Sequence, residues 1–417
     1  MSQTNANILT LRDGQLAASR NASALPRVSS RCRVECIKDA AAFETLKTPM
    51  AVLAETSLEP ALCSEFAWIN AGLRYLAESA GDVCVALVWR YDGVNDGREL
   101  IGAFVQKTSR RLPFLPGRQA KSWKHIFCPL CAPLVHRDHA AEALEAYFNW
   151  VFGPDVAAAS IMWEQVPVSG PLAEAIEDTS RATGSRQRSI SSYRRAVLQV
   201  PEDLDSYLVH SLPRKKRKEL RRLRARLGEQ GRLSVEQFPI GGDLGQWLKE
   251  FYALEACGWK GRAKTALSCD PVWTGFFDQA MADLDGQGDV LFWKLCLNGV
   301  PVAMTFGARH GRHAWLCKIA YDEDYARFSP GVLIVLDAMG ILAAGGAIDT
   351  IDSCAQADHP MIDHLWRERL DLHDIVIGRP EQSWFMFAMV CRLADLKREG
   401  REAVKRLYRK YLKGGQK

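Results

Sequence analysis

Three apolar runs, separated by short polar turns, follow one another at 289–297, 300–309 and 313–321. The first turn is Asn298-Gly299, and an Asn-Gly pair between two apolar runs favours a β-hairpin because both residues tolerate positive φ. The pattern therefore predicts two paired strands followed by a third strand.

The third run leads into an apolar helix whose first residues favour anion binding. Ser329 is expected at the N-cap and Pro330 at the first helical position, where its missing N–H costs nothing. The N–H groups of Gly331, Val332 and Leu333 would then lack partners within the helix. Because such a helix start attracts phosphate, and Gly allows close approach, the order of elements predicts a fold that holds a cofactor pyrophosphate.

The first half of the chain repeats this order of elements without appreciable sequence identity. Its expected elements are two strands within 83–107, a run near 123–133, a helix at 139–151, a strand at 158–166 and a helix at 171–183. The later half continues with a helix at 331–344, a strand at 347–354 and a helix from about 359 to 370. We therefore predict an α/β fold with one domain per half.

Length and composition are consistent with two or three domains, since the chain has 417 residues and 47% of them are apolar. The predicted segments are a polar, mobile tail at 1–30, a first domain at 31–200, a connecting helix at 201–232, a second domain at 233–380 and basic C-terminal helices at 381–417. No run approaches the length of a membrane span, and no signal pattern opens the chain, which favours a cytoplasmic location.

Positive charge is concentrated in one short segment. Residues 214–226 contain nine Lys or Arg and one Glu, while the net charge of the chain is only +5. Leu220, Leu223 and Leu227 form a narrow apolar stripe on this helix. The helix either contacts phosphates of a cofactor, an RNA or an anionic polymer, or it is a solvated connector.

Two patterns resemble known sites but lack essential features. His125, Cys128 and Cys131 have the residue types of a zinc site, yet the surrounding sequence is apolar and broken by proline, which favours buried thiols. Residues 258–265 resemble a phosphate-binding loop without its second Gly and without a preceding strand. We therefore expect no metal, no nucleotide hydrolysis, and twelve reduced, mostly buried cysteines.

Candidate acid–base groups lie at three places. Glu255 falls on the apolar side of a predicted helix, so it either pairs with Lys260 or Arg262 or has the raised pKa of a proton-transfer group. Asp352 lies at the carboxyl end of a predicted strand, where α/β sheets usually bind ligands. Asp358 and Pro360 fit a helix start, and His359 or His364 could act as acid or base.

Several motifs of the later half resemble the GNAT acetyltransferase superfamily, most closely its CelD-like branch, which is associated with bacterial cellulose and exopolysaccharide synthesis. Beside the hairpin and third strand, they are the basic helix at 215–227, Gly-Trp-Lys-Gly at 258–261, Ser-Pro-Gly at 329–331 and Asp-Ser…His-Pro-Met…Leu-Trp at 352–366. The resemblance implies tandem GNAT-like acyltransferase domains with a mixed sheet, joined by the basic helix. We expect the first domain to be degenerate, because no Ser-Pro-Gly precedes its helix.

The resemblance also implies N-acyl transfer, in which an amine attacks a thioester and coenzyme A leaves. The residues expected to hold the acyl-CoA donor are Lys318, Ile319, Arg327, Ser329, Pro330, Gly331, Val332 and Leu333. The expected bases are Glu255, Asp352 and His359. Expected contacts to substrate or phosphate are Arg217, Trp259, Lys260 and Trp366.

The family's Arg/Gln-x-x-Gly-x-Gly/Ala loop is incomplete here, because Leu333 occupies its later small position. Acetyl-CoA and longer acyl-CoA therefore both stay open as donors to a small-molecule, saccharide or peptide acceptor. Related Fem-type transferases use aminoacyl-tRNA instead, and the basic helix would then bind RNA. A non-catalytic module that binds an anionic polymer or a partner protein is the third alternative.

Overall fold

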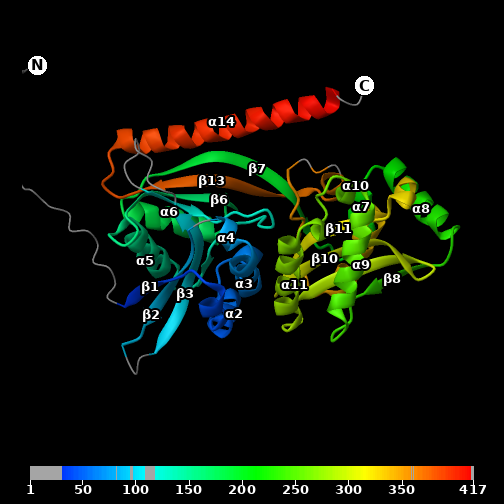
Figure 1. The fold of residues 1–417 in the computed structure, drawn as a ribbon, viewed down its shortest axis with the longest axis horizontal. Coiled ribbons are helices and arrows are strands. Elements are labelled where there is room, and N and C mark those ends of the chain that lie inside the picture. Colours follow the sequence, from blue (N-terminus) through cyan, green and yellow to red (C-terminus); the bar gives the residue numbers. More distant parts are fainter. Residues whose placement is uncertain are drawn as a thin grey trace, which may run out of the picture.

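The computed structural model describes residues 31–80, 82–93, 97–108, 118–357, 359 and 361–414 (Figure 1). The predicted tail at 1–30, Asp358 and Pro360 lie outside the described residues. The strands are β1 (Cys32–Ile37), β2 (Val83–Tyr91), β3 (Arg98–Thr108), β4 (Arg118–Ser122), β5 (Leu134–Val135), β6 (Ala158–Pro167), β7 (Gln187–Gln199), β8 (Leu233–Gln237), β9 (Val290–Leu297), β10 (Val300–His310), β11 (His313–Tyr321), β12 (Thr350–Asp352) and β13 (Glu368–Gly378).

The helices connect and cover these strands. They are α1 (Ala40–Glu44), α2 (Lys47–Glu55), α3 (Phe66–Tyr75), α4 (Ala77–Ala80), α5 (Ala140–Phe152), α6 (Pro171–Ala182), α7 (Leu204–Ser211), α8 (Arg214–Gly228), α9 (Leu244–Cys257), α10 (Trp259–Arg262), α11 (Pro271–Asp285), α12 (Pro330–Gly345), α13 (Ile362–Leu365) and α14 (Trp384–Gly414). Short 3₁₀ turns are η1 (Leu62–Ser64), η2 (Leu267–Cys269) and η3 (Glu323–Phe328). None of the described helices is long and apolar enough to cross a membrane.

The two halves of the chain share one continuous mixed sheet. Its strand order is β1-β2-β3-β4-β6-β13-β7-β12-β11-β10-β9-β8, and β5 pairs with β3 beside this path. Figure 1 shows the early elements on one side, the later elements on the other, and α14 lying along β7 and β13. The predicted α/β class with a mixed sheet is confirmed.

Two strands are exchanged between the halves. β7 belongs to the early half in sequence but pairs with β12, where Val197 lies opposite Asp352. β13 belongs to the late half but pairs with β6, where Val376 lies opposite Met162. β7 and β13 also pair with each other over most of their length. Because both become interior strands, neither half leaves an open edge at the junction. The domain boundaries at 200 and 380 stay predictions.

The predicted hairpin is present, with β9 and β10 antiparallel. Asn298 and Gly299 have φ values of 53° and 80°, as a tight two-residue hairpin turn requires. The third run also forms its predicted strand, β11, antiparallel to β10.

The predicted helix from about 359 to 370 is wrong. The helix α13 covers only Ile362–Leu365, and the strand β13 begins at Glu368. Leu370 and Leu372 alternate with polar residues, and β13 has a partner strand on each side. This pairing satisfies the backbone of residues 368–378 and outweighs local helix propensity. The predicted strand at 347–354 is also shorter, since β12 is Thr350–Asp352.

One cysteine pair differs from the expectation of reduced thiols. Cys36 on β1 and Cys84 on β2 are joined by a disulfide between neighbouring strands. Other cysteines are free, and Cys63, Cys128 and Cys131 are among those that are buried. The thiols near the junction of the halves are therefore available for packing and chemistry.

Two apolar clusters cover opposite faces of the later strands. Phe306 belongs to the cluster that includes α9, α11 and much of the early half. Leu316 belongs to a separate cluster with α12 and the apolar stripe of α8. The predicted stripe of Leu220, Leu223 and Leu227 is confirmed, because all three are buried. The sheet of the later half thus has an α9/α11 face and an α12 face.

The contact between His310 and Glu65 at the junction of the halves is expected to make the stability of the fold depend on pH. His310 Nδ1 on β10 lies 3.5 Å from Glu65 Oε2, beside α3. The hydrogen bond to Glu65 raises the pKa of His310 against the effect of burial, and Asp289 and Glu55 add to the rise. Because the folded pKa exceeds the unfolded value, the protonated ring stabilises the fold fully below about pH 6.5, and this contribution is lost as pH rises through the folded pKa.

We expect His310→Gln to be less stable than the wild type near pH 6 and to approach it at about pH 9. Thermal unfolding at a series of pH values measures this difference. His210→Gln, at an exposed position, is the matched control and should show no such trend. A difference for His310→Gln that is constant across the range would contradict the assignment.

Candidate functional site

The strands β11 and β12 part in the middle of the sheet. They pair in parallel from His313 opposite Thr350 to Trp315 opposite Asp352. β12 then ends, while β11 continues to Tyr321. Among the described residues, no strand therefore pairs with β11 on this side beyond Trp315.

A β-bulge lies at the same place. In the β10–β11 pairing, Phe306 is opposite Lys318 while Gly307 is opposite Leu316, so Cys317 is an extra residue on β11. A bulge re-aims the side chains that follow it. Cys317 and Lys318 accordingly both lie on the α9/α11 face, where the Lys318 ammonium is 5.4 Å from the centre of the Phe127 ring.

A cavity of about 570 Å³ opens on this face, between the two halves. Early-half residues that line it are Trp68, residues 124–129, Gln165, Tyr193 and Arg195. Late-half residues that line it are Phe277, Cys317, Lys318 and residues 354–357. We call it the junction cavity. Gln165 and Cys354 both have positive φ values, 54° and 52°, and such strain in non-glycine residues gathers at functional sites.

A buried ion pair forms one wall of the junction cavity. Arg195 on the exchanged strand β7 donates through Nη2 to Asp352 Oδ2 and through Nη1 to the Pro129 carbonyl. Arg195 and Asp352 are 1% and 5% exposed. Asp352 Oδ1 also accepts a hydrogen bond of 2.9 Å from the Cys354 N–H. The candidate base Asp352 is therefore fully engaged by its neighbours.

Two thiols face each other where the strands part. The pairing of β11 with β12 ends at Trp315 and Asp352. Cys317 and Cys354 each lie two residues beyond that point, and both line the junction cavity. The hydrogen bond between them, together with burial, raises the pKa of Cys354 well above its usual value. The Cys354 side chain is thus a neutral thiol at neutral pH, rather than a thiolate nucleophile.

Glu255 on α9 connects this helix to the segments that carry Lys260 and Leu267, next to β11. Its Oε1 accepts a 2.7 Å hydrogen bond from the Lys260 ammonium, and its Oε2 accepts one of 2.7 Å from the Leu267 N–H. Lys260 also donates to the Ile319 carbonyl on β11 at 3.1 Å. Glu255 thus pairs with Lys260, one of the two partners that the sequence had suggested.

Lys318 is enclosed by aromatic rings near this pair. Burial lowers its pKa, and the Glu255 carboxylate counteracts that effect. The Thr305 hydroxyl donates to the Lys318 carbonyl at 3.0 Å, which fixes the strand beside the bulge. The side chain of Lys318, unlike its backbone, was not singled out in the sequence.

His359 caps the short helix α13. Its Nδ1 accepts hydrogen bonds from the Met361 and Ile362 N–H groups at 3.4 and 3.3 Å. Burial lowers the pKa of His359, and the nearby Lys260 ammonium adds to the effect. The ring is therefore neutral at pH 7, with Nδ1 as the acceptor.

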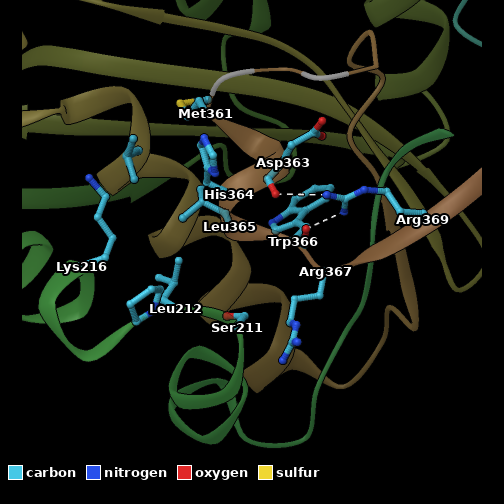
Figure 2. Close-up of a pocket in the computed structure, with 12 residues that line it drawn as sticks. Ser211, Leu212, Lys216, Met361, Asp363, His364, Leu365, Trp366, Arg367 and Arg369 are labelled. Atoms are coloured by element: carbon cyan, nitrogen blue, oxygen red, sulfur yellow. Dashed lines mark hydrogen bonds between the residues drawn. The ribbon is translucent and has the colours of Figure 1, made fainter. Parts of the chain in front are cut away.

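A second pocket of about 680 Å³ lies beside α12, α8 and α13 (Figure 2). We call it the helix pocket. Figure 2 shows Lys216 and Arg369 on opposite sides of it, with His364 and Trp366 between them. Arg369 is held by the Trp366 and Glu368 carbonyls at 2.6 and 2.9 Å. Pro213 and Val332, at the starts of α8 and α12, also line it, so the positive ends of two helices border the pocket.

The start of α12 differs in detail from the prediction. Ser329 occupies the N-cap and Pro330 the first position, but the Ser329 side chain makes no capping bond. The N–H groups of Val332 and Leu333 donate to the Ser329 carbonyl at 2.9 and 3.2 Å. The expectation of three unpartnered N–H groups is therefore wrong for these two residues. A Cβ on Gly331 would lie 3.1 Å from Tyr321, so this glycine lets α12 pack closely on β11.

The remaining predicted contact residues are dispersed. Trp366 is fully buried, and its Nε1 lies 3.2 Å from Met339 Sδ. Trp259 is half-exposed, and its N–H donates to Glu323 at 2.5 Å. Arg217 donates to the Leu212 carbonyl at 3.3 Å, and the exposed Arg327 stacks on Phe328. The structure thus brings Glu255, Lys260, Lys318 and Ile319 together. The other four residues, Arg217, Trp259, Arg327 and Trp366, do not join this group.

Of the possible zinc ligands, His125 and Cys128 line the junction cavity, and Cys131 lies next to Cys128. Cys128 and Cys131 are buried with their sulfur atoms 3.5 Å apart, and burial lowers the pKa of His125 to about 3. Among the described residues, no group of three or more His, Cys, Asp or Glu side chains is arranged to hold a metal ion.

Comparison with known proteins supports the fold. Residues 214–359 match the family model described as an acetyltransferase (GNAT) domain, so this part of the chain is similar to GNAT acetyltransferase domains. No curated protein matches the chain in sequence. The crystal structure of FemX is 12% identical with a TM-score of 0.51, covering 79% of this chain and 95% of FemX.

A second solved structure with the same fold is a conserved protein of unknown function from Bacteroides thetaiotaomicron VPI-5482. It is 9% identical with a TM-score of 0.51, and the match covers 83% of this chain and 100% of that one. A tandem GNAT protein from the clavulanic acid biosynthesis pathway aligns at 16% identity and a TM-score of 0.38, over 84% of this chain and 100% of that one. The family match over residues 214–359 supports the predicted GNAT-like fold for the later half.

Breaking the Glu255 contacts tests how this site is held together. Glu255→Ala leaves the buried Leu267 N–H without an acceptor and Lys260 without its carboxylate, so we expect a loss of about 2–4 kcal/mol in the free energy of unfolding. Glu255→Gln keeps an oxygen for Leu267 and should lose less. Urea unfolding measures both.

Glu219→Ala is the control, because the pair of Glu219 with Lys216 is solvent-exposed and should contribute less than about 1 kcal/mol. Equal losses for the Glu255 and Glu219 variants would show that Glu255 does not anchor the segments behind β11.

Proposed function

We propose that this protein is an acyltransferase that moves an acyl group from acyl-CoA to an amine or hydroxyl acceptor at the parting of β11 and β12. The observation that carries the proposal is the bulged stretch of β11, which pairs with β12 only as far as Trp315 and lies in the segment that matches the GNAT acetyltransferase model. The junction cavity reaches this stretch at Cys317 and Lys318, and the helix pocket lies at the start of α12. A thioester at this point can receive N–H groups from β11 while its two ends reach opposite faces of the sheet.

The donor lies on the α12 side. The helix pocket offers Lys216, Arg367 and Arg369 beside the starts of α8 and α12, which suits the phosphates of coenzyme A. Gly331 and Ser329 shape the helix start there, and Arg327 is exposed nearby. The acyl chain then points toward Cys317 and the junction cavity, where the acceptor binds.

The chemistry needs a donor to the oxyanion and a base. The base takes one proton from the acceptor ammonium, and the free amine forms a bond to the thioester carbon. The carbon–sulfur bond then breaks, and the coenzyme A thiolate takes up the second proton that the acylated nitrogen releases. N–H groups near Lys318 and Ile319 stabilise the oxyanion. Glu255 remains our first base, reached through Lys260, followed by Asp352 and His359. The resemblance to the CelD-like branch supports an acceptor in polysaccharide or cell-envelope synthesis.

A charge introduced into the helix pocket tests donor binding. Val332 lines this pocket, so Val332→Glu places a carboxylate next to the expected phosphates. We expect at least about a tenfold loss of coenzyme A affinity by isothermal titration calorimetry, since like charges repel strongly in a partly enclosed site.

The matched control is Val300→Glu on the exposed hairpin, which should bind coenzyme A as the wild type does. Wild-type protein that binds neither coenzyme A nor acetyl-CoA, or unchanged affinity in Val332→Glu, would refute the proposed donor.

An aminoacyl-tRNA donor is the second candidate, and the exposed face of α8 favours it. Lys218, Arg221 and Arg222 are exposed and form no ion pair with a described residue. The neighbouring Arg224 instead pairs with Asp337 on α12 at 2.8 Å, which holds α8 in place. The outer face of the helix is therefore free to meet phosphates.

If this face binds tRNA, affinity should fall steeply with salt. Replacing both Lys218 and Arg221 with Gln should then lower the slope of log K against log salt by roughly 1.5. Filter binding at several salt concentrations measures the slope, and coenzyme A serves as the competing ligand. No tRNA binding at low salt would exclude this candidate.

A further inference from the structure

The junction cavity is positively charged. Among the described residues that line it, Lys124, Arg195 and Lys318 carry a cation or can carry one, and none is Asp or Glu. Neither lysine forms an ion pair with a described residue. Arg195 is offset by Asp352. Lys318 is enclosed by Phe127 and Phe277, and the Glu255 carboxylate near it is itself paired with the Lys260 ammonium. An enclosed cation without a direct counter-ion is costly, and a bound anion would relieve that cost.

Unsatisfied polar atoms lie in the same wall. Arg195 Nε and Gln165 Oε1 are buried and form no hydrogen bond with any described residue, while the Tyr193 hydroxyl lies beside the Gln165 side chain. Arg195 is only 1% exposed, so its Nε–H has no access to bulk water. Buried polar atoms normally have partners, and two in one cavity indicate a ligand that supplies them.

The chemistry of these atoms restricts the ligand. Arg195 Nε can only donate, so it needs an acceptor such as a carboxylate or phosphate oxygen. Gln165 Oε1 can only accept, so it needs a hydroxyl or ammonium donor. Trp68, Phe127 and Phe277 give the cavity apolar walls that suit a ring or chain between the two ends.

We propose that the junction cavity binds an acceptor that carries an anionic group, a carboxylate or a phosphate, in the same molecule as the amine that receives the acyl group. The anion lies between Arg195 Nε and the Lys318 ammonium, and the amine lies toward Gln165 and the bulge of β11. This inference rests on the proposed function, since that function places the acceptor on this face.

Matched pairs of amines test the inference with the full chain. Phenylalanine and phenethylamine differ in a carboxylate, while glucosamine 6-phosphate and glucosamine differ in a phosphate; inorganic phosphate is the minimal probe. Calorimetry without donor measures the dissociation constants. We expect the anionic member of at least one pair to bind at least about tenfold more tightly, which also identifies the anion as carboxylate or phosphate.

Lys318→Met removes the charge and keeps an apolar side chain of similar length. It should reduce the preference for the anionic member to less than about threefold, whereas Lys249→Met, at an exposed position on α9, should retain the full preference. Circular dichroism verifies that Lys318→Met is folded. Equal binding within both pairs, absence of binding by every anionic probe, or a preference that Lys318→Met leaves intact would overturn the inference.

Coenzyme A binding, measured separately, distinguishes the two possible failures. If coenzyme A binds and the anionic amines show no preference, the acceptor class is wrong and the acyltransferase proposal stands. If the anionic amines bind through Lys318 and coenzyme A does not bind, the cavity is a site for an anionic amine and the proposed donor is wrong.

Discussion

The ion pair between Arg195 and Asp352 is the contact on which this architecture depends. It joins the exchanged strand β7 to the end of β12, where β11 and β12 part. Both groups are almost completely buried, so loss of either would leave a charge without compensation. Through the Pro129 carbonyl, the same guanidinium fixes the early-half loop that lines the junction cavity. One contact therefore fixes the strands, the loop and the cavity wall together.

The bulge on β11 gives the two faces of the sheet different roles. Because it adds Cys317, both Cys317 and Lys318 point to the α9/α11 face, while Leu316 and Ile319 pack toward α12. Lys260, which is paired with Glu255, donates a hydrogen bond to the Ile319 carbonyl. The Ile319 backbone is thus held in place, and the junction cavity lies on the α9/α11 face of the strand.

Local signals in the sequence predicted the elements of the later half well. The Asn298-Gly299 turn, the apolar stripe of α8 and the Ser-Pro-Gly helix start depend on neighbouring residues, so their patterns are readable. The helix expected from about 359 to 370 failed because β13 is set by pairing with β6 and β7, which lie far away in sequence. Arg195 was missed for the same reason, since only the strand exchange brings it to Asp352. The Glu255–Lys260 pair, five residues apart, was within reach of sequence reasoning.

The exchange of β7 and β13 also affects what happens when the chain is cut. A nick in the segment between β7 and α7 would leave each fragment holding a strand that completes the sheet of the other. The two pieces would remain associated by backbone hydrogen bonds along β7 and β13, as complementary halves of a split protein. Each half alone would therefore lack one interior strand of its sheet.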